Sequence, residues 1–327
     1  MSTDATREKN WLLGLLRLAM VLLFIGLVAG SLDFSGEGTS FDRRHLWAFW
    51  FIQPFQVMCV WIVALRLWML IPQPRPPLNE TFKAYLLSTG LNNVLPGRLS
   101  ELIKLTYLGK RQDTTYAGVA SAVFLERYAD VVLFACLLFL GFGSAWLTTS
   151  PLVQGAILAG LVGGLCSIPL WRAPFKWLAR LAPTSTSHSF LMTVYDNLCD
   201  AVATPRFVWA LVFGVVAWAM GFVTVYAGLM LMAPMSWQAA LTVYAAIAVG
   251  RLIPGLPGGL GTYEASGVLA LTHLGYGVGE ALTITLTLHV SQSAFPTLAA
   301  FGLMTYTRMG VVHTLRELTS SLRKARS

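Results

Sequence analysis

Long apolar runs separated by short polar segments dominate the 327-residue chain. An α-helix needs about 20 predominantly apolar residues to cross a bilayer, and runs near or above this length recur along the sequence. The pattern predicts an all-α polytopic membrane protein with about six transmembrane helices. We place them at residues 11–32, 47–71, 116–140, 151–171, 207–232 and 281–306. The first run is longer than the apolar region of a cleaved signal peptide, the rival interpretation, so a retained span is favoured.

Proline and glycine interrupt two further apolar segments, 79–108 and 237–275. Each uninterrupted piece is about a dozen residues long, too short for a full span, so both segments are predicted to be re-entrant helical hairpins. The second break, Arg251–Glu264, echoes the first, Asn92–Glu101: both contain Leu-Pro-Gly, one residue, Leu, a small residue and then Glu, with two extra residues, Thr262 and Tyr263, before the Glu of the second. Broken helix is tolerated at membrane depth where it is buried or lines a watery cavity. The two breaks are therefore predicted to line one shared cavity.

The distribution of basic residues predicts the orientation. With the N-terminus in the cytoplasm, 17 of the 23 Lys and Arg residues fall in cytoplasmic segments, as the positive-inside rule requires. Both termini then lie inside, and 311–327 is a basic cytoplasmic tail. In this topology the half 150–310 runs upside down relative to the half 11–147, which makes residues 1–327 a single membrane domain with a 3+3 inverted repeat. Inverted repeats with matched broken helices are typical of transporters whose site lies near the bilayer midplane.

Composition agrees with this class. The chain is 56% hydrophobic and only 12% charged, too few charges to cover a soluble surface of this size. The net charge of +8 comes mostly from residues that flank apolar runs, which predicts contact with anionic phospholipid at the cytoplasmic face and argues against nucleic acid as a partner. The four Cys and five His are dispersed, so neither a metal site nor another cofactor is expected.

Residues of the two breaks are the first candidate binding groups. Broken helices expose backbone N–H groups at the start of the following half-helix, where anions are favoured. The alternative is a plain loop, although two breaks at matched positions favour a functional role. The candidates at the breaks are Asn93, Pro96, Pro254, Pro257, Gly258, Gly259 and Gly261.

Ionisable side chains beside the breaks are the second group. Arg98, Lys104 and Arg251 are candidate ligands of a lipid phosphate, with snorkelling of Lys104 to the headgroups as the alternative. Glu101 and Glu264 occupy equivalent places after the breaks, where a carboxylate can carry protons or balance a cationic headgroup. A local pair, such as Glu264 with Arg251, is the alternative.

A third cluster lies inside the span 116–140. Glu126, Arg127 and Asp130 are costly to place there, and such charges usually face a cavity. A salt bridge that holds the span together is an equally good interpretation. His289 and Gln292, in the last span, are expected to have hydrogen-bonded packing roles.

Three motifs, in this order, resemble the lysylphosphatidylglycerol synthase transmembrane-region family of flippase-like integral membrane proteins. They are Leu95-Pro-Gly-Arg-Leu-Ser-Glu101, Glu126-Arg-Tyr-Ala-Asp130 and Pro254-Gly-Leu-Pro-Gly-Gly-Leu-Gly-Thr-Tyr-Glu264. Ser100 stands where the family commonly has glycine, and His289 where an arginine is expected. The resemblance implies movement of aminoacyl-phospholipids or isoprenoid-linked glycolipids between leaflets. The soluble aminoacyl-transferase domain of the two-part members has no counterpart here, so lipid synthesis is not implied.

We therefore expect a bacterial inner-membrane lipid transporter rather than an enzyme, with membrane lipid as substrate and a lipid-modifying synthase or glycosyltransferase as a candidate partner. Two alternatives stay open. One is a membrane-embedded enzyme of polyprenyl or phospholipid metabolism, which would need a metal cluster or a nucleophile beside a base. The other is a noncatalytic accessory partner of a glycosyltransferase.

Overall fold

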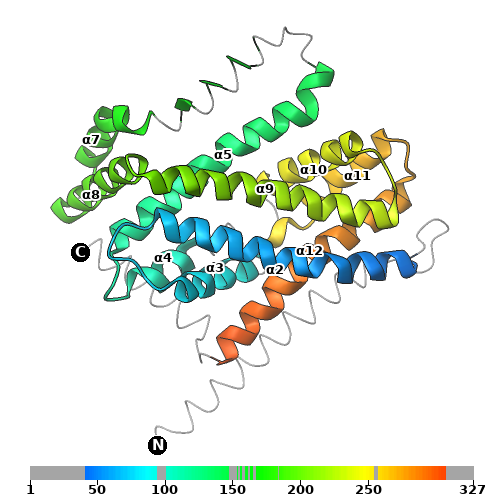
Figure 1. Cartoon of the computed structure of the whole chain (residues 1–327), viewed down its shortest axis with the longest axis horizontal. Helices are drawn as coiled ribbons and strands as arrows, with labels where there is room; N and C mark the ends of the chain where they lie inside the picture. The colour runs from blue at the N-terminus through cyan, green and yellow to red at the C-terminus, as the bar shows by residue number, and fades with distance from the viewer. Residues whose placement is uncertain are drawn as a thin grey trace, which may run out of the picture.

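The chain folds entirely into helices in a computed structural model that describes residues 41–93, 101–146, 167–182, 184–253 and 257–306, together with isolated positions between 153 and 164 (Figure 1). Two 3-10 turns, η2 (Ile168–Trp171) and η3 (Pro257–Gly259), accompany ten α-helices in these residues. The α-helices are α2 (Arg43–Leu70), α3 (Leu78–Asn92), α4 (Glu101–Gly109), α5 (Tyr116–Trp146), α7 (Arg172–Arg180), α8 (Ser185–Val202), α9 (Pro205–Met232), α10 (Trp237–Leu252), α11 (Thr262–His273) and α12 (Val278–Tyr306).

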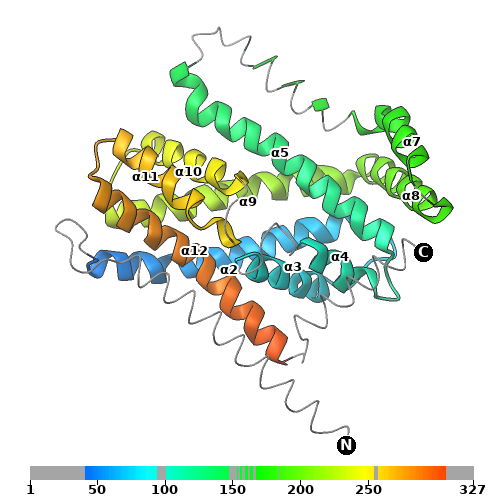
Figure 2. The same ribbon diagram turned by 180° about the vertical axis from the view of Figure 1, so that it is seen from behind.

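Helices α2 and α9 form the central pair. They pack along their lengths and run in opposite directions (Figures 1 and 2). Each has 28 residues and contains an 18-residue stretch with a mean hydropathy of 1.7 in α2 and 2.1 in α9. Within the described parts of the chain, these two helices are long and apolar enough to cross a bilayer. They match the helices expected at 47–71 and 207–232.

Two helical hairpins pack on this pair. Helices α3 and α4 form the first hairpin, and α10 and α11 form the second. The hairpins lie toward opposite ends of the α2–α9 pair, as both views show (Figures 1 and 2). The interruptions expected in segments 79–108 and 237–275 are thus present as breaks between short helices, while their depth in a membrane remains a prediction.

A long helix follows each hairpin. Helix α5 packs against α4, and α12 packs against α11. From the centre of the molecule, the two long helices extend in opposite directions (Figure 1). Both begin and end within a few residues of the spans expected at 116–140 and 281–306.

The two breaks meet at the centre of the molecule. Gly258, in the second break, has a φ of 71°, and a Cβ atom built on it would lie 3.2 Å from the Cα of Asn93 in the first break. Asn93 is fixed from the other side because its Nδ2 donates to Oγ1 of Thr297 on α12 at 2.8 Å. The contact therefore joins both hairpins and the last long helix.

Helices α7 and α8 make up most of the polar segment 172–206, between the expected fourth and fifth spans. Helix α7 carries three basic residues, and the large side chains of Trp177 and Leu178 are exposed beside them. This pattern is typical of a helix that lies on a membrane surface. The expected first span and basic tail lie outside the described residues, as does part of the fourth span.

Candidate functional site

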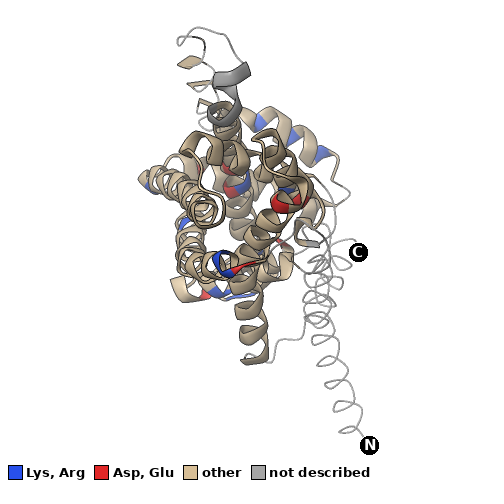
Figure 3. Cartoon of the chain, turned by 90° about the vertical axis from the view of Figure 1, so that its right-hand side faces the viewer, with Lys and Arg blue, Asp and Glu red and all other residues tan. Residues whose placement is uncertain are grey.

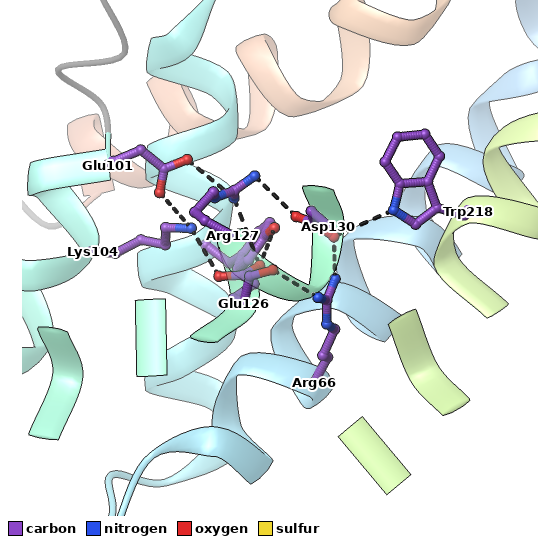
Figure 4. A network of polar contacts seen from close by, with 8 residues as sticks. Arg66, Glu101, Lys104, Glu126, Arg127, Asp130 and Trp218 are labelled. Atoms are coloured by element: carbon purple, nitrogen blue, oxygen red, sulfur yellow. Dashed lines mark hydrogen bonds and ion pairs between the residues drawn. The ribbon is translucent and has the colours of Figure 1, made fainter. Parts of the chain in front are cut away.

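Six charged side chains from three helices meet in the first half of the chain, and we call them the six-charge network (Figure 4). Charged positions are few among the uncharged ones along the described helices (Figure 3). It contains three carboxylates and three cations, so its formal charge is zero. Helix α2 contributes one residue, α4 two and α5 three. The members are Arg66, Glu101, Lys104, Glu126, Arg127 and Asp130.

Arg66 ties α2 to α5. Its Nη1 lies 2.6 Å from Oδ1 of Asp130, and its Nη2 donates to the backbone oxygen of Glu126 at 2.9 Å. The same Oδ1 atom of Asp130 accepts from the indole Nε1 of Trp218 on α9 at 3.3 Å. Arg66 is 2% exposed and is almost fully withdrawn from solvent, while the side chain of Asp130 is 20% exposed. The sequence had given Arg66 no role.

Glu126 is the buried centre of the network, with no solvent exposure. The hydroxyl of Tyr85 donates to its Oε1 at 2.7 Å, and Nζ of Lys104 lies 3.2 Å from its Oε2. Lys104 also lies 2.7 Å from Glu101 and is only 1% exposed. Snorkelling of Lys104 to the headgroups is therefore wrong, and its charge is already matched by two carboxylates.

Arg127 forms the accessible edge of the network. Its side chain is 40% exposed, and its terminal nitrogens lie 3.0 Å from Glu101 and 3.1 Å from Asp130. Its Nε is buried without a hydrogen-bond partner. The interpretation of Glu126, Arg127 and Asp130 as a bridge within one span is thus too narrow, because their partners lie on α2, α4 and α9 as well.

A second polar site lies at the start of α11. Glu264 accepts from the backbone N–H of Gly261 at 2.6 Å, which satisfies one of the free donors of the helix N-terminus. Its other oxygen lies 2.5 Å from Nδ1 of His289 on α12. The alternative of a local pair between Glu264 and Arg251 is wrong, since the carboxylate is held by His289, whereas local capping by Glu264 is present. A basic partner at position 289 is present after all, as an imidazole.

His289 in turn binds the second break. Its Nε2 lies 3.2 Å from the backbone oxygen of Gly258, and its ring stacks on Tyr263 with centroids 4.1 Å apart. Pro257, Gly258 and Gly259 form η3, whose glycines have the positive φ angles that favour this residue type.

Arg251 closes the second site on the accessible side. Its guanidinium lies 5.0 Å from the ring centroid of Tyr263, and its Nη2 donates to Oε1 of Gln292. No ion pair recorded among the described residues includes Arg251. Oη of Tyr263 and Nε2 of Gln292 are buried without hydrogen-bond partners. A cation and two unused hydrogen-bonding groups are thus close together on α10, α11 and α12.

The two sites share a plan. In each half a glutamate in the first turn of the helix after the break contacts a base on the next long helix, which is Arg127 for Glu101 and His289 for Glu264. The candidates Pro96, Arg98 and Pro254 lie outside the described residues. Sequence reasoning gave no role to Arg66, Tyr85, Trp218 or the side chain of Tyr263, and it gave His289 and Gln292 only packing roles. An unpaired charge within a span, as at Arg66, was the available signal, because such a charge demands a partner.

Within the described parts of the chain, no three His, Cys, Asp or Glu side chains come together as a metal site would require. Span-length apolar helices, hairpins with central breaks and ion pairs buried between helices define the class as a helical integral membrane protein. A family model described as the lysylphosphatidylglycerol synthase TM region matches residues 12–300, and the chain belongs to this family. Searches of curated proteins and of solved structures return no significant match.

Proposed function

We propose that the protein is a flippase-like transporter of the bacterial inner membrane. It moves a polar-headgroup lipid, such as an aminoacyl-phospholipid or an isoprenoid-linked glycolipid, between leaflets without changing it chemically. One observation carries the proposal: the two helix breaks touch at Asn93 and Gly258, with a buried ionisable site directly after each break. Family membership supports it.

The proposal includes the inverted repeat. Pairs of corresponding elements are α2 with α9, α3–α4 with α10–α11, and α5 with α12. In each pair the order of helices, the break and the packing partners agree, and the long helices run in opposite directions (Figure 1). Two halves related in this way can exchange roles when the cavity opens to one leaflet or the other.

Arg251 is our candidate for the lipid phosphate. It carries a charge that no described carboxylate neutralises, and its planar guanidinium can donate two parallel hydrogen bonds to phosphate oxygens. Nε2 of Gln292 and the hydroxyl of Tyr263 are unused groups beside it. Arg98 and the backbone N–H groups of the residues that follow Pro96 and Pro254 would add to this site, since proline itself has no N–H.

The six-charge network is our candidate binding site for a cationic group of the lipid headgroup. Arg127 is its exposed member and holds Glu101 and Asp130 at the edge. An amino group that approaches from this side competes with Arg127 for the two carboxylates. Glu126 remains satisfied during this exchange, because Tyr85 and Lys104 bind it from the buried side.

Lipid translocation in proteoliposomes tests the proposal. The purified full-length protein is reconstituted with fluorescent aminoacylated phosphatidylglycerol or with a fluorescent polyprenyl-phosphate sugar, and leaflet exchange is followed by quenching. We expect one lipid to cross, and Arg251→Gln to slow it at least about tenfold through loss of charge-assisted hydrogen bonds. Arg43→Gln, which removes an exposed charge at the start of α2, is the matched control and keeps the wild-type rate.

The same samples separate the alternatives. Mass spectrometry of the recovered lipid would reveal a chemical change if the protein were an enzyme. No exchange of either lipid by folded protein would overturn the transporter and favour an accessory role beside a glycosyltransferase. Equal rates for Arg251→Gln and the wild type would remove Arg251 from the phosphate site.

A further inference from the structure

The pair formed by Glu264 and His289 is arranged to hold one shared proton. Nδ1 of His289 lies 2.5 Å from Oε1 of Glu264. Two acceptors cannot approach so closely, so a proton lies between them, either on the imidazole or on the carboxyl group. Both side chains are nearly buried, with 5% of His289 and 11% of Glu264 exposed.

The second nitrogen of His289 fixes where this proton must be. Nε2 faces the backbone oxygen of Gly258 at 3.2 Å, and a carbonyl oxygen can only accept. Nε2 therefore carries its own hydrogen, and the proton between Nδ1 and Glu264 is additional to it. Removal of this shared proton leaves the carboxylate of Glu264 facing the lone pair of Nδ1. The imidazole then either moves away or transfers its hydrogen to Nδ1, and the bond to Gly258 is lost.

Besides the bond between them, His289 and Glu264 each make one hydrogen bond to the backbone of the second break. His289 holds the carbonyl of Gly258, and Glu264 holds the N–H of Gly261. Gly258 is also the residue that abuts Asn93 of the first hairpin. Loss of the shared proton therefore changes the hydrogen bond between His289 and Gly258, and Gly258 is itself in contact with the first break.

We infer that Glu264 and His289 form a proton-binding site whose occupancy sets the position of the second break against the first. With the proton bound, the break is tied to α12 and touches Asn93. Without it, the break is released. If the protein transports lipid as proposed above, the proton is the coupling ion, and this last clause alone rests on the proposed function.

The surroundings leave the pair as the titrating unit. The Tyr263 ring stacks on the imidazole, and the guanidinium of Arg251 lies 5.0 Å from the centroid of the same ring. Beyond them, Cys59 of α2 and Tyr244 of α10 lie within electrostatic range of Arg251. Asn93, which follows α3, and Gln292 of α12 are uncharged. In the described part of the chain, no second carboxylate is recorded in a hydrogen bond or ion pair with Glu264 or His289.

Two measurements on the full-length protein in detergent test the site. Nitrogen NMR of labelled histidine follows His289 from about pH 5 to about pH 8, the range in which imidazole titrates. Hydrogen–deuterium exchange follows the backbone of residues 257–264 over the same range. We expect His289 to titrate. Exchange of this segment, after correction for the intrinsic pH dependence of amide exchange, should rise about tenfold in step with that titration, because a charge-assisted bond is lost.

Variants separate the pair from general effects of pH. His289→Gln assigns the resonance and should abolish the pH dependence of exchange, whereas His273→Gln, which removes an exposed histidine at the end of α11, should leave both unchanged. His289→Arg supplies a permanent cation like that of Arg127 and should hold the segment protected at every pH. A His289 that does not titrate, or exchange that ignores its titration, would overturn the proton site.

Lipid movement in proteoliposomes containing a trapped pH dye tests the coupling. Proton flux that accompanies lipid movement and disappears in His289→Arg supports it. Lipid movement without proton flux overturns the coupling. A titrating His289 in a protein that moves no lipid overturns the proposed function and leaves the proton-binding site standing.

Discussion

The two halves place a glutamate at the same point, one turn or less after a helix break, but surround it differently. Glu101 meets the ammonium of Lys104 and the guanidinium of Arg127, within a network that also fixes Arg66, Glu126 and Asp130. Glu264 meets His289, the side chain whose charge changes near neutral pH. The first site is therefore a permanent electrostatic link between helices, and the second is an adjustable one.

The difference extends to the breaks themselves. The second carboxylate site binds its own break directly, through Gly258 and Gly261. The first site binds neighbouring helices instead, through Arg66, Tyr85 and Trp218. One half thus provides a fixed frame, and the other provides the part that can move against it.

Breaking the permanent site should have the largest effect on stability. Lys104→Met leaves Glu126, which is fully buried, without its nearest cation. We expect a loss of about 3–5 kcal/mol of unfolding free energy, the usual cost of removing one partner of a buried pair. Denaturant unfolding in detergent measures it. Lys176→Met, at an exposed position of α7, is the control, and a loss below about 1 kcal/mol for Lys104→Met would show that the pair is not buried in this sense.

The contact between the breaks is the next target. Gly258→Ala adds a Cβ atom 3.2 Å from the Cα of Asn93 at a residue with positive φ, so we expect a loss of about 2–3 kcal/mol. Gly275→Ala is the matched control, because Gly275 also has positive φ but has open space around it. The difference between the two variants in thermal unfolding measures the contact. Equal losses would mean that the breaks do not press on each other.

Disrupting the adjustable site should lower the unfolding free energy less than disrupting the permanent one. His289→Gln removes the short bond to Glu264, while the carboxylate keeps the N–H of Gly261. The expected loss is about 1–2 kcal/mol, that of one charge-assisted hydrogen bond. Denaturant unfolding beside His273→Gln checks this. A cost that equals or exceeds that of Lys104→Met would contradict the distinction between the two sites.

Substitutions at the N-terminal caps of the central helices, α2 and α9, should have the smallest effect on stability. Asp42, which precedes α2, accepts from the backbone N–H of Arg44, whereas Thr204 makes no side-chain cap for α9. Asp42→Ala should cost about 1 kcal/mol, and Thr204→Ala less. Slight burial opposes the charge of Asp42, but hydrogen bonds from Arg44 and His45 outweigh it and lower its pKa to about 2. Its contribution is therefore complete above its ordinary pKa of 3.8 and is lost as the pH falls toward 2. Thermal unfolding at pH 7 and at low pH measures both variants.

Much of this architecture is written locally in the sequence. Apolar runs of span length fixed the helices near 47–71, 116–140, 207–232 and 281–306, since a bilayer-crossing helix needs that length. Leu-Pro-Gly and the glycine-rich stretch before Glu264 located the two breaks, because proline and positive-φ glycine cannot continue a helix. The three motifs also identified the family that the match over 12–300 confirms.

Partner choice was decided only by the tertiary structure. Lys104 looked like a snorkelling lysine, yet α5 carries Glu126 to it, and Arg66 found Asp130 across 64 positions of chain. Glu264 was given Arg251 by proximity in sequence, but the packing of α11 on α12 gave it His289. A run of residues records that a charge is present and costly to bury. Which opposite charge offsets that cost depends on helix packing, and it is this packing that made one half of the molecule permanent and the other responsive to protons.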